Sequence, residues 1–373
     1  MKMLKTLVAT SILASVSSLS FAETLTLYTS QPNKDAQMTV DAFEKANPGI
    51  DVEWVRDGTT KLMTKLRAEL SSGVVNPDVL LIADSVTMES MAKDGYLAPY
   101  LSPNRSNYDA SLYHNEGYYY GTKLITTGIV RHQRAPEKPT DWSDFTKPEY
   151  KNQIAMPSPL YSGAALIHLA TLTDEASLGW SYYEALHNNQ VMAQGGNGSV
   201  LKAVSSGTKP YGVIVDFLAI REAQKGSPLE FVFPKTGVSM VTEPVAIMKG
   251  SKNQAAAQKF VDFVLSKQGQ QLVLDQGYLP ARSDMPVPEG FPAREDIKLM
   301  AFDAVNAARY GTIHSLVMAT RKPPKGLVKA PFVVEQGIDL SDLKEPLCLY
   351  KGSVRDAAQK FPANVNVAVA LSL

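Results

Sequence analysis

The sequence has few of the residues from which covalent cross-links and metal centres are built. It contains one cysteine, Cys348, so an internal disulfide and a cysteine-rich metal site are both excluded. Its five histidines show no metal-ligand spacing. Net charge is also absent, since 37 basic residues balance 37 acidic ones, which argues against nucleic-acid or anionic-membrane binding. We therefore predict no metal, no cofactor and no nucleic-acid partner.

Long hydrophobic runs are missing as well. The apolar stretch at residues 7–19 is too short to cross a bilayer, and no later stretch approaches the length of a membrane-spanning helix. Lys2 and Lys5 precede this stretch, and Ser20-Phe21-Ala22 follows it, an order typical of a secretory signal peptide. We expect residues 1–22 to be removed before Glu23 and the mature protein to reside in the periplasm.

The 373 residues exceed the size at which a single hydrophobic core stops growing, so more than one domain is expected. A strand, a polar turn and a helix follow one another three times in the first part of the mature chain, a pattern typical of an open, largely parallel α/β sheet. The expected strands are 23–28, 50–55, 79–82, 124–130, 154–156, 211–215 and 240–248. The expected helices are 35–46, 61–70, 86–93, 141–145, 165–172, 200–204 and 253–274.

This order predicts two α/β lobes. Residues 23–121 and 240–303 are assigned to the first lobe, and residues 122–239 to the second, because the chain crosses near 121–130 and returns near 230–241. Open α/β sheets bind ligands at the carboxyl ends of their strands. Two such edges that face each other would form a cleft able to close by hinge motion.

Polar turns follow several of the expected strands. Three of them combine glycine with hydroxyl groups just before a helix, where free N–H groups and the positive helix end favour an anion. Ordinary helix capping is the alternative explanation, since Ser, Thr and Asn are common caps. The candidate ligand-binding residues in these turns, and in the similar turn after the first strand, are Thr29, Ser30, Gln31, Gly58, Thr59, Thr60, Ser162, Gly163, Ala164, Asn197 and Ser199.

Carboxylates end or interrupt three apolar strands and are expected to be partly buried near the cleft. A partly buried carboxylate needs a partner, either a ligand hydroxyl or amine, or a basic side chain of the protein. The candidate ligand-binding residues here are Asp84, its neighbour Ser85, Asp216 and Glu243. Their alternative partners in salt bridges are Lys61, Lys123 and Arg221.

Signals for catalysis are weak. The sequence has no nucleophile elbow, no phosphate loop that ends in Gly-Lys-Ser/Thr and no dinucleotide fingerprint. The run Tyr118-Tyr119-Tyr120 offers phenolates to a hard metal, but packing at the hinge is the favoured interpretation. We therefore predict no catalytic residues.

Several motifs, in this order, resemble a known family. They are LTLYTSQPNKDAQMTVDAFEKANPGIDVEWV (25–55), PDVLLIADS (77–85), SGAA (162–165), SSGTKPYGVIVDF (205–217) and LSKQGQQLVLDQGYLPARSD (265–284). Over residues 23–303 the chain resembles periplasmic solute-binding proteins of ABC importers, in the ferric-ion-binding-protein-like branch of the type II fold. The resemblance implies two lobes with a hinged cleft, a monomer, and an ABC permease in the inner membrane as partner.

The resemblance also bears on the ligand. Members of this branch bind ferric ion, sugar phosphates, phosphoglycerate or 2-aminoethylphosphonate. The paired tyrosines of the iron binders correspond here to Phe217 and Leu218, which cannot ligate iron. Ser162-Gly163-Ala164 match the loop that holds phosphate, and Asp216 and Glu243 match residues that hold sugar hydroxyls. A small phosphorylated or phosphonate solute is therefore expected, and a ferric ion held with an anion is the alternative.

The last seventy residues resemble a different family. NAARYGTIHSLVMATRKPPKGL (306–327) and GSVRDAAQKFPANVNVAVALSL (352–373) resemble a fragment of L-aspartate dehydrogenase. The dinucleotide-binding half of that enzyme has no counterpart, so an inactive product derived from the dehydrogenase is the less favoured interpretation. We expect residues 304–373 to form a separate fragment, joined near 302–308 by a gene fusion, a deletion or an assembly artefact.

The proposed signal peptide gives a first testable prediction. Expression in a Gram-negative host should yield a periplasmic protein whose mature sequence starts at Glu23, as measured by intact mass and N-terminal sequencing. Replacing Lys2 and Lys5 together by Glu should leave uncleaved precursor in the cytoplasm, because the basic region orients the signal peptide. Normal export of the double variant would contradict the assignment.

Overall fold

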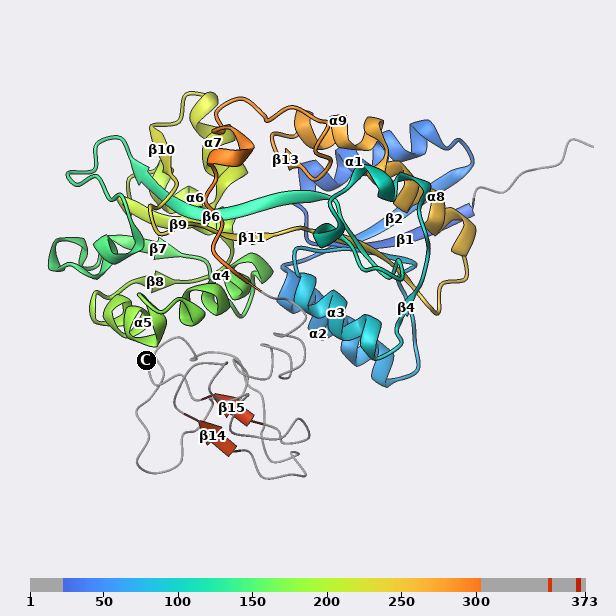
Figure 1. Cartoon of the computed structure of the whole chain (residues 1–373), viewed down its shortest axis with the longest axis horizontal. Coiled ribbons are helices and arrows are strands. Elements are labelled where there is room, and N and C mark those ends of the chain that lie inside the picture. The colour runs from blue at the N-terminus through green and yellow to red at the C-terminus, as the bar shows by residue number, and fades with distance from the viewer. Residues whose placement is uncertain (1–22, 303–347, 351–366, 370–373) are drawn as a thin grey trace, which may run out of the picture.

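Two α/β lobes lie side by side in the computed structural model, which describes residues 23–302, 348–350 and 367–369 (Figure 1). Each lobe is built on its own mixed sheet, with helices on both faces. Among the described residues, no helix combines the length and the apolar character needed to cross a membrane. The expectation of two α/β lobes is confirmed.

The first lobe is a six-stranded sheet in the order β2-β1-β3-β12-β4, with β5 also paired to β12. Side chains of β1 alternate between the two faces: Leu25 and Leu27 face α1 and α8, whereas Tyr28 packs with residues of α2 and α3. The elements are β1 (Glu23–Thr29), α1 (Asn33–Ala46), β2 (Ile50–Arg56), α2 (Thr59–Ser71), β3 (Val79–Leu81), α3 (Ser85–Lys93), β4 (Leu97–Ala98), β5 (Tyr120–Gly121), β12 (Pro244–Met248) and α8 (Gln254–Leu265).

The second lobe is a seven-stranded sheet in the order β10-β6-β9-β7-β8, with β11 and β13 also paired to β6. Its elements are β6 (Lys123–His132), β7 (Ile154–Met156), α4 (Gly163–Asp174), α5 (Gly179–Asn188), β8 (Met192–Ala193), α6 (Asn197–Ser205), β9 (Tyr211–Val215), α7 (Asp216–Gln224), β10 (Leu229–Val232), β11 (Ser239–Val241) and β13 (Leu279–Pro280). Between α8 and β13 lies α9 (Lys267–Asp275), which contacts both. In the C-terminal part, β14 (Cys348–Tyr350) pairs in parallel with β15 (Val367–Val369).

The structure corrects four expectations. The sheets are mixed rather than largely parallel, because β6 and β12 run antiparallel to most of their neighbours. The expected strand 240–248 is two strands, since β11 belongs to the second sheet and β12 to the first. The expected helix 253–274 breaks at Ser266, whose side chain caps α9. The short helix expected at 141–145 is a 3-10 helix, Trp142–Thr146.

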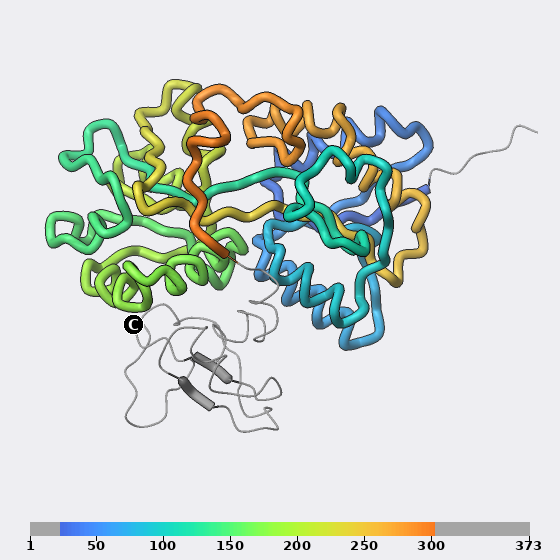
Figure 2. Tube along the Cα trace, viewed as in Figure 1, coloured from blue at the N-terminus to red at the C-terminus, as the bar shows by residue number. Residues whose placement is uncertain are grey.

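The chain after α9 contacts both lobes, and Ala281 packs in the core of the first. β13 pairs with the start of β6, and Leu299 bridges to Val238. Figure 2 shows this last orange stretch running down the second lobe, where Met300 joins the core formed around Trp142. The assignment of residues 23–121 and 240–303 to the first lobe and of 122–239 to the second stays a prediction.

Two of the crossings between the lobes run next to each other; a third follows α8, since β13 belongs to the second sheet. One of the two adjacent crossings is the step from β5 to β6 at Thr122, and the other is the step from β11 to β12 at Thr242 and Glu243. The N–H of Thr122 donates to the Thr242 carbonyl at 3.1 Å, and the Thr122 hydroxyl donates to the Glu243 carbonyl at 2.8 Å. Glu243 has φ of 38°, a left-handed conformation that is uncommon for a residue with a side chain. These two crossings therefore act as one paired hinge.

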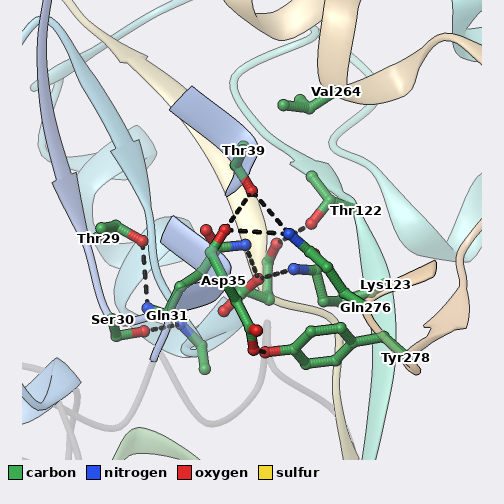
Figure 3. Close-up of polar contacts among 12 residues, drawn as sticks. Thr29, Ser30, Gln31, Asp35, Thr39, Thr122, Lys123, Val264, Gln276 and Tyr278 are labelled. Carbon is green, nitrogen blue, oxygen red and sulfur yellow. Dashed lines mark hydrogen bonds and ion pairs between the residues drawn. The ribbon is translucent and has the colours of Figure 1, made fainter. Parts of the chain in front are cut away.

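A buried ion pair joins the same two crossings. Lys123 Nζ lies 2.6 Å from Glu243 Oε2, with side chains 1% and 3% exposed. Gln31, just after β1, adds a hydrogen bond from its Nε2 to the same carboxylate oxygen at 3.3 Å. Figure 3 shows Gln31 and Lys123 in this polar cluster. Burying either charge without the other would cost much free energy, so loss of one partner alone should destabilise the protein strongly.

Replacing Lys123 by Met should lower the free energy of unfolding by about 3–5 kcal/mol, because Glu243 would remain buried without its counter-charge. The double variant Lys123→Met, Glu243→Gln should recover most of that loss. Urea denaturation measures both.

A matched control is Lys225→Met, since Lys225 is 54% exposed in its pair with Glu222 and should contribute less than about 1 kcal/mol. Equal losses for the two lysine variants would contradict the role given to the hinge pair.

Candidate functional site

Three helix N-termini meet at one cleft between the lobes. The first residues of α2, from the first lobe, and of α4 and α6, from the second, line a space of about 370 Å³. The first-turn N–H groups of a helix have no partner within the helix, and the helix dipole makes that end positive. The convergence of three such ends, which the sequence predicted from the turn composition, makes this cleft attractive to an anion.

The helix-capping alternative holds for one of the three turns. Ser162 caps α4, since its hydroxyl accepts from the N–H of Ala165 at 3.3 Å. α2 and α6 begin at Gly58 and Gly196, which supply no capping side chain. Their first-turn donors therefore have no cap that would compete with a ligand.

The polar side chains of the cleft are held in place by their neighbours. Asn197 donates to the Ser162 hydroxyl at 3.2 Å and accepts from the N–H of Val215 at 3.1 Å, which links α6 to α4 and to β9. Ser30 accepts from the N–H of Ala83 at 2.9 Å. Such second contacts orient the groups that line the cleft before any ligand enters.

Gly163, expected to bind the ligand, instead lies at a contact between the lobes. It does not line the cleft but forms a point where the second lobe touches the first. A Cβ at this position would overlap the carbonyl oxygen of Ala83 and lie 2.9 Å from Thr59 Cβ. Only glycine lets α4 approach the first lobe this closely.

Arg56 is a cleft residue that the sequence reasoning missed. It is the last residue of β2, and it is the single Lys or Arg side chain among the described residues that line the cleft. Its Nε donates to the Gln31 carbonyl at 2.8 Å, and its Nη1 donates to the Tyr161 hydroxyl at 3.4 Å. Its place at the carboxyl end of a strand beside the Gly58 turn was the signal that could have identified it.

One wall of the cleft is apolar. Phe217 and Tyr278 stack with ring centroids 4.0 Å apart, and Ile125, Val215 and Leu218 complete this wall. The site therefore combines a polar, positive end with an apolar face, a combination common in small-molecule sites.

The three candidate carboxylates are more deeply buried than expected, and two of them do not reach the cleft. Asp84 caps α3 by accepting from the N–H and the hydroxyl of Thr87. Asp216 accepts from the N–H and hydroxyl of Thr126, at 2.8 and 2.7 Å, and from the N–H of Phe217 at 2.6 Å. Both are committed to structural hydrogen bonds behind the lining.

Glu243 does line the cleft, and its partner is Lys123, as the salt-bridge alternative proposed. The other two basic candidates pair elsewhere, Lys61 with Asp57 and Arg221 with Asp35. Burial raises the pKa of Glu243, against the attraction of the Lys123 ammonium. Burial also raises the pKa of Asp84, and it raises that of Asp216 to about 7.

The candidate residues divide into two groups by position. Those that line the cleft are Ser30, Gly58, Thr59, Ser162, Ala164, Asn197, Ser199 and Glu243. Those that lie outside its lining are Thr29, Gln31, Thr60, Asp84, Ser85, Gly163 and Asp216. Several members of the second group hydrogen-bond within the protein instead: Gln31 with Glu243, Thr60 with the Pro159 carbonyl and Asp216 with Thr126.

A second ionic group, also missed from the sequence, lies beside the hinge. Asp35, in the first turn of α1, is 1% exposed and accepts from the Tyr278 hydroxyl at 2.6 Å (Figure 3). It also accepts from Arg221 Nη1 at 3.0 Å. Lys123 Nζ lies 4.2 Å from the centroid of the Tyr278 ring. Arg221 belongs to α7 of the second lobe, so Asp35 ties the two lobes together at this end of the cleft.

No group of three or more His, Cys, Asp or Glu side chains within the described ranges could hold a metal ion. Phe217 and Leu218, at the positions of the iron binders' tyrosines, line the cleft. The tyrosine run packs in the first lobe, where the Tyr119 hydroxyl donates to Glu89 and the Tyr120 hydroxyl donates to the Tyr100 carbonyl.

Comparisons with known proteins separate the chain into two parts. The sequence pattern of the family described as bacterial extracellular solute-binding protein matches residues 75–307. That of the family described as aspartate dehydrogenase, C-terminal, matches residues 303–373. The expected change of family near residue 303 is confirmed.

Curated relatives follow the same division. L-aspartate dehydrogenase of Bradyrhizobium diazoefficiens is 61% identical over 75 residues, which are 20% of this chain and 27% of that enzyme. The chain thus spans about a quarter of the length of this enzyme and of L-aspartate dehydrogenase 3 of Bordetella bronchiseptica. An uncharacterized protein of Haemophilus influenzae is 29% identical over 276 residues, 68% of this chain and 76% of that one.

Solved structures match the two-lobed part. The periplasmic binding protein AfuA from Actinobacillus pleuropneumoniae, with fructose-6-phosphate bound, has a TM-score of 0.70 at 22% identity, covering 77% of this chain and 93% of that one. Iron-bound HitA from Pseudomonas aeruginosa has a TM-score of 0.65 at 21% identity, covering 76% and 94%. The fold is therefore that of the type II periplasmic binding proteins, as the sequence resemblance implied.

The position of Asp216 yields a prediction about pH. Burial raises the pKa of Asp216 in the folded protein to about 7, from an ordinary value of 3.8. The folded state therefore binds this proton more tightly than the unfolded state. The resulting stabilisation is complete below about pH 4 and is lost as the pH rises through 7. Asp216→Asn removes this titration while keeping an oxygen that accepts from Thr126.

The stability of the Asn variant relative to the wild type should therefore rise by about 1.4 kcal/mol per pH unit between roughly pH 4 and 7. Urea denaturation across this range measures the difference. A stability difference independent of pH would contradict the raised pKa of Asp216.

Proposed function

The chain belongs to the bacterial extracellular solute-binding protein family, and on that premise we propose that it captures a small phosphorylated or phosphonate solute in the periplasm for an ABC importer. The two lobes close on the solute and present it to a permease in the inner membrane. No chemical step on the solute is part of this function.

The convergence of three helix N-termini with Arg56 in one cleft is the observation that carries the proposal. Each N-terminus offers N–H donors and a partial positive charge, and Arg56 adds a full one. A phosphate or phosphonate group has several acceptor oxygens and can use donors from all of these directions together. Its charge is then met from both lobes, which favours closure around it.

The remainder of the cleft suggests the rest of the solute. The stacked Phe217 and Tyr278 offer an apolar face of the kind on which a sugar ring or carbon chain packs. Glu243 lines the same region, and its charge is already met by Lys123. A neutral hydroxyl that donates to Glu243 fits this environment better than an amine, since an amine would add a second positive charge.

The bound ligand of one structural neighbour agrees with this chemistry. AfuA is described with exogenous fructose-6-phosphate bound, a phosphorylated and hydroxyl-rich molecule. At 22% identity the likeness concerns the fold, so it supports the class of solute only together with the cleft residues named above. The ferric alternative has less support, because Phe217 and Leu218 offer no ligand atoms to iron.

The dehydrogenase match concerns the chain beyond residue 303 and covers about a quarter of those enzymes. The proposed solute site lies wholly in the two-lobed part, so its function does not depend on that match.

A panel of solutes tests the proposal. Glucose-6-phosphate, phosphoglycerate, 2-aminoethylphosphonate, phosphate and ferric citrate are added separately, and the melting temperature is measured. A solute that binds the folded protein raises the melting temperature by mass action, so at least one organic phosphate or phosphonate should do so. A shift with ferric citrate alone, or with none of the five, would rule the proposal out.

Arg56→Gln should weaken binding of the active solute roughly 10- to 150-fold, the loss expected for a hydrogen bond to a charged group worth about 1.5–3 kcal/mol. Isothermal titration calorimetry measures the affinity. Arg134→Gln is the control, because Arg134 is exposed and does not line the cleft. Equal affinities for the Arg56 variant and the wild type would remove Arg56 from the site.

A further inference from the structure

Tyr161 lies against two positions that have no side chain. One is Gly58, the N-cap of α2 in the first lobe, and the other is Gly196, the N-cap of α6 in the second. A Cβ on Gly58 would lie 2.7 Å from Tyr161 Cε1, and a Cβ on Gly196 would lie 2.8 Å from the same atom. Real Cβ atoms do not approach other atoms this closely, so any side chain at either position would displace the ring.

The hydroxyl of Tyr161 is held by the first lobe. Arg56 Nη1 donates to it at 3.4 Å. Burial acts to raise the pKa of Asp57, but Lys61, the N–H of Gly58 and the Tyr161 hydroxyl together lower it. Tyr161 itself belongs to the turn that leads into α4 of the second lobe. One side chain thus reaches from the second lobe to the N-terminus of α2.

The backbone around Tyr161 docks at the same place. The Thr60 hydroxyl, in the first turn of α2, donates to the Pro159 carbonyl at 3.2 Å. Tyr161 and Gly58 both line the cleft. The contact between the turn 158–162 and α2 therefore forms one boundary of the space in which the solute would bind.

We propose that Tyr161 is the residue that closes the cleft and sets how tightly the two lobes hold a solute. Its ring docks on Gly58 when the lobes meet, and Gly196 provides the second surface against which the ring rests. This proposal relies on the proposed function for the nature of the solute, but not for the closure itself.

The physical consequence is a shift between open and closed populations. Contacts made only in the closed form stabilise it, and a ligand that binds the closed form binds more weakly when that form is less populated. Gly58→Ala should obstruct docking of the ring and of the Tyr161 carbonyl. Affinity for the solute should then fall although no group that contacts the solute has been removed.

A double-mutant cycle isolates the ring from other effects. Gly196→Ala meets only Tyr161 ring atoms, so its cost should vanish in a Tyr161→Ala background. The probe is glucose-6-phosphate, and the affinity is measured by titration calorimetry. We expect Gly196→Ala to weaken binding roughly tenfold in the wild-type background and to have little effect with Tyr161→Ala.

A second measurement reports closure without a ligand. Spin labels at Lys93 and Glu184, exposed positions in α3 and α5, give the distribution of distances between the lobes once Cys348 is replaced by Ser. Gly58→Ala and Tyr161→Ala should each shift this distribution from short to long distances. Tyr161→Phe, which keeps the ring, should restore most of the short-distance population.

Tyr96→Ala is the matched control, since Tyr96 is 42% exposed on the first lobe and does not line the cleft. Equal costs of Gly196→Ala in both backgrounds, or an unchanged distance distribution in Gly58→Ala, would overturn the proposal. If wild-type protein binds no glucose-6-phosphate, the proposed solute class fails for that probe, while the distance measurement still decides the role of Tyr161.

Discussion

The buried ion pair between Lys123 and Glu243 is the constraint on which the arrangement of the lobes depends. It joins two of the places where the chain passes from one sheet to the other, inside a hinge whose backbone groups are also paired. Glu243 adopts a left-handed conformation there, which turns the chain from β11 into β12. β6 starts at Lys123 and β12 starts directly after Glu243, so the ion pair fixes the starting points of one strand in each lobe.

The need to pair buried charges also decides which charged groups can meet a ligand. Asp35, Asp84 and Asp216 each lie close in the chain to residues that line the cleft, yet each is paired with another group of the protein. Buried carboxylates without such partners would be unstable, so the fold uses them as internal ties. Positive character remains at the cleft because it comes from helix N-termini and from Arg56.

Features of the fold and the site that depend on neighbouring residues could be predicted from the sequence, whereas those that depend on residues far apart in the chain could not. Alternating apolar residues identified β1, a continuous apolar run identified β9, and turn composition identified the starts of α2, α4 and α6, because these are local features. The break between β11 and β12 was missed, since the run 240–248 is apolar throughout apart from Thr242 and Glu243. Arg56 was missed although it ends a strand just before a glycine-containing turn, because only the fold shows that this strand end faces the cleft. Asp216 was placed at the cleft because a strand end does not reveal where a carboxylate finds hydrogen-bond donors.

The sequence by itself determined that this is a two-lobed α/β protein with polar, glycine-containing turns before its helices, joined to a segment of a second family. Those properties follow from local composition and periodicity. Only the tertiary structure decided which turns meet, that Lys123 is the partner of Glu243, and that Tyr161 bridges Gly58 and Gly196. Such pairings join residues far apart in the chain, and their energies depend on burial and on close approach, neither of which a local pattern contains.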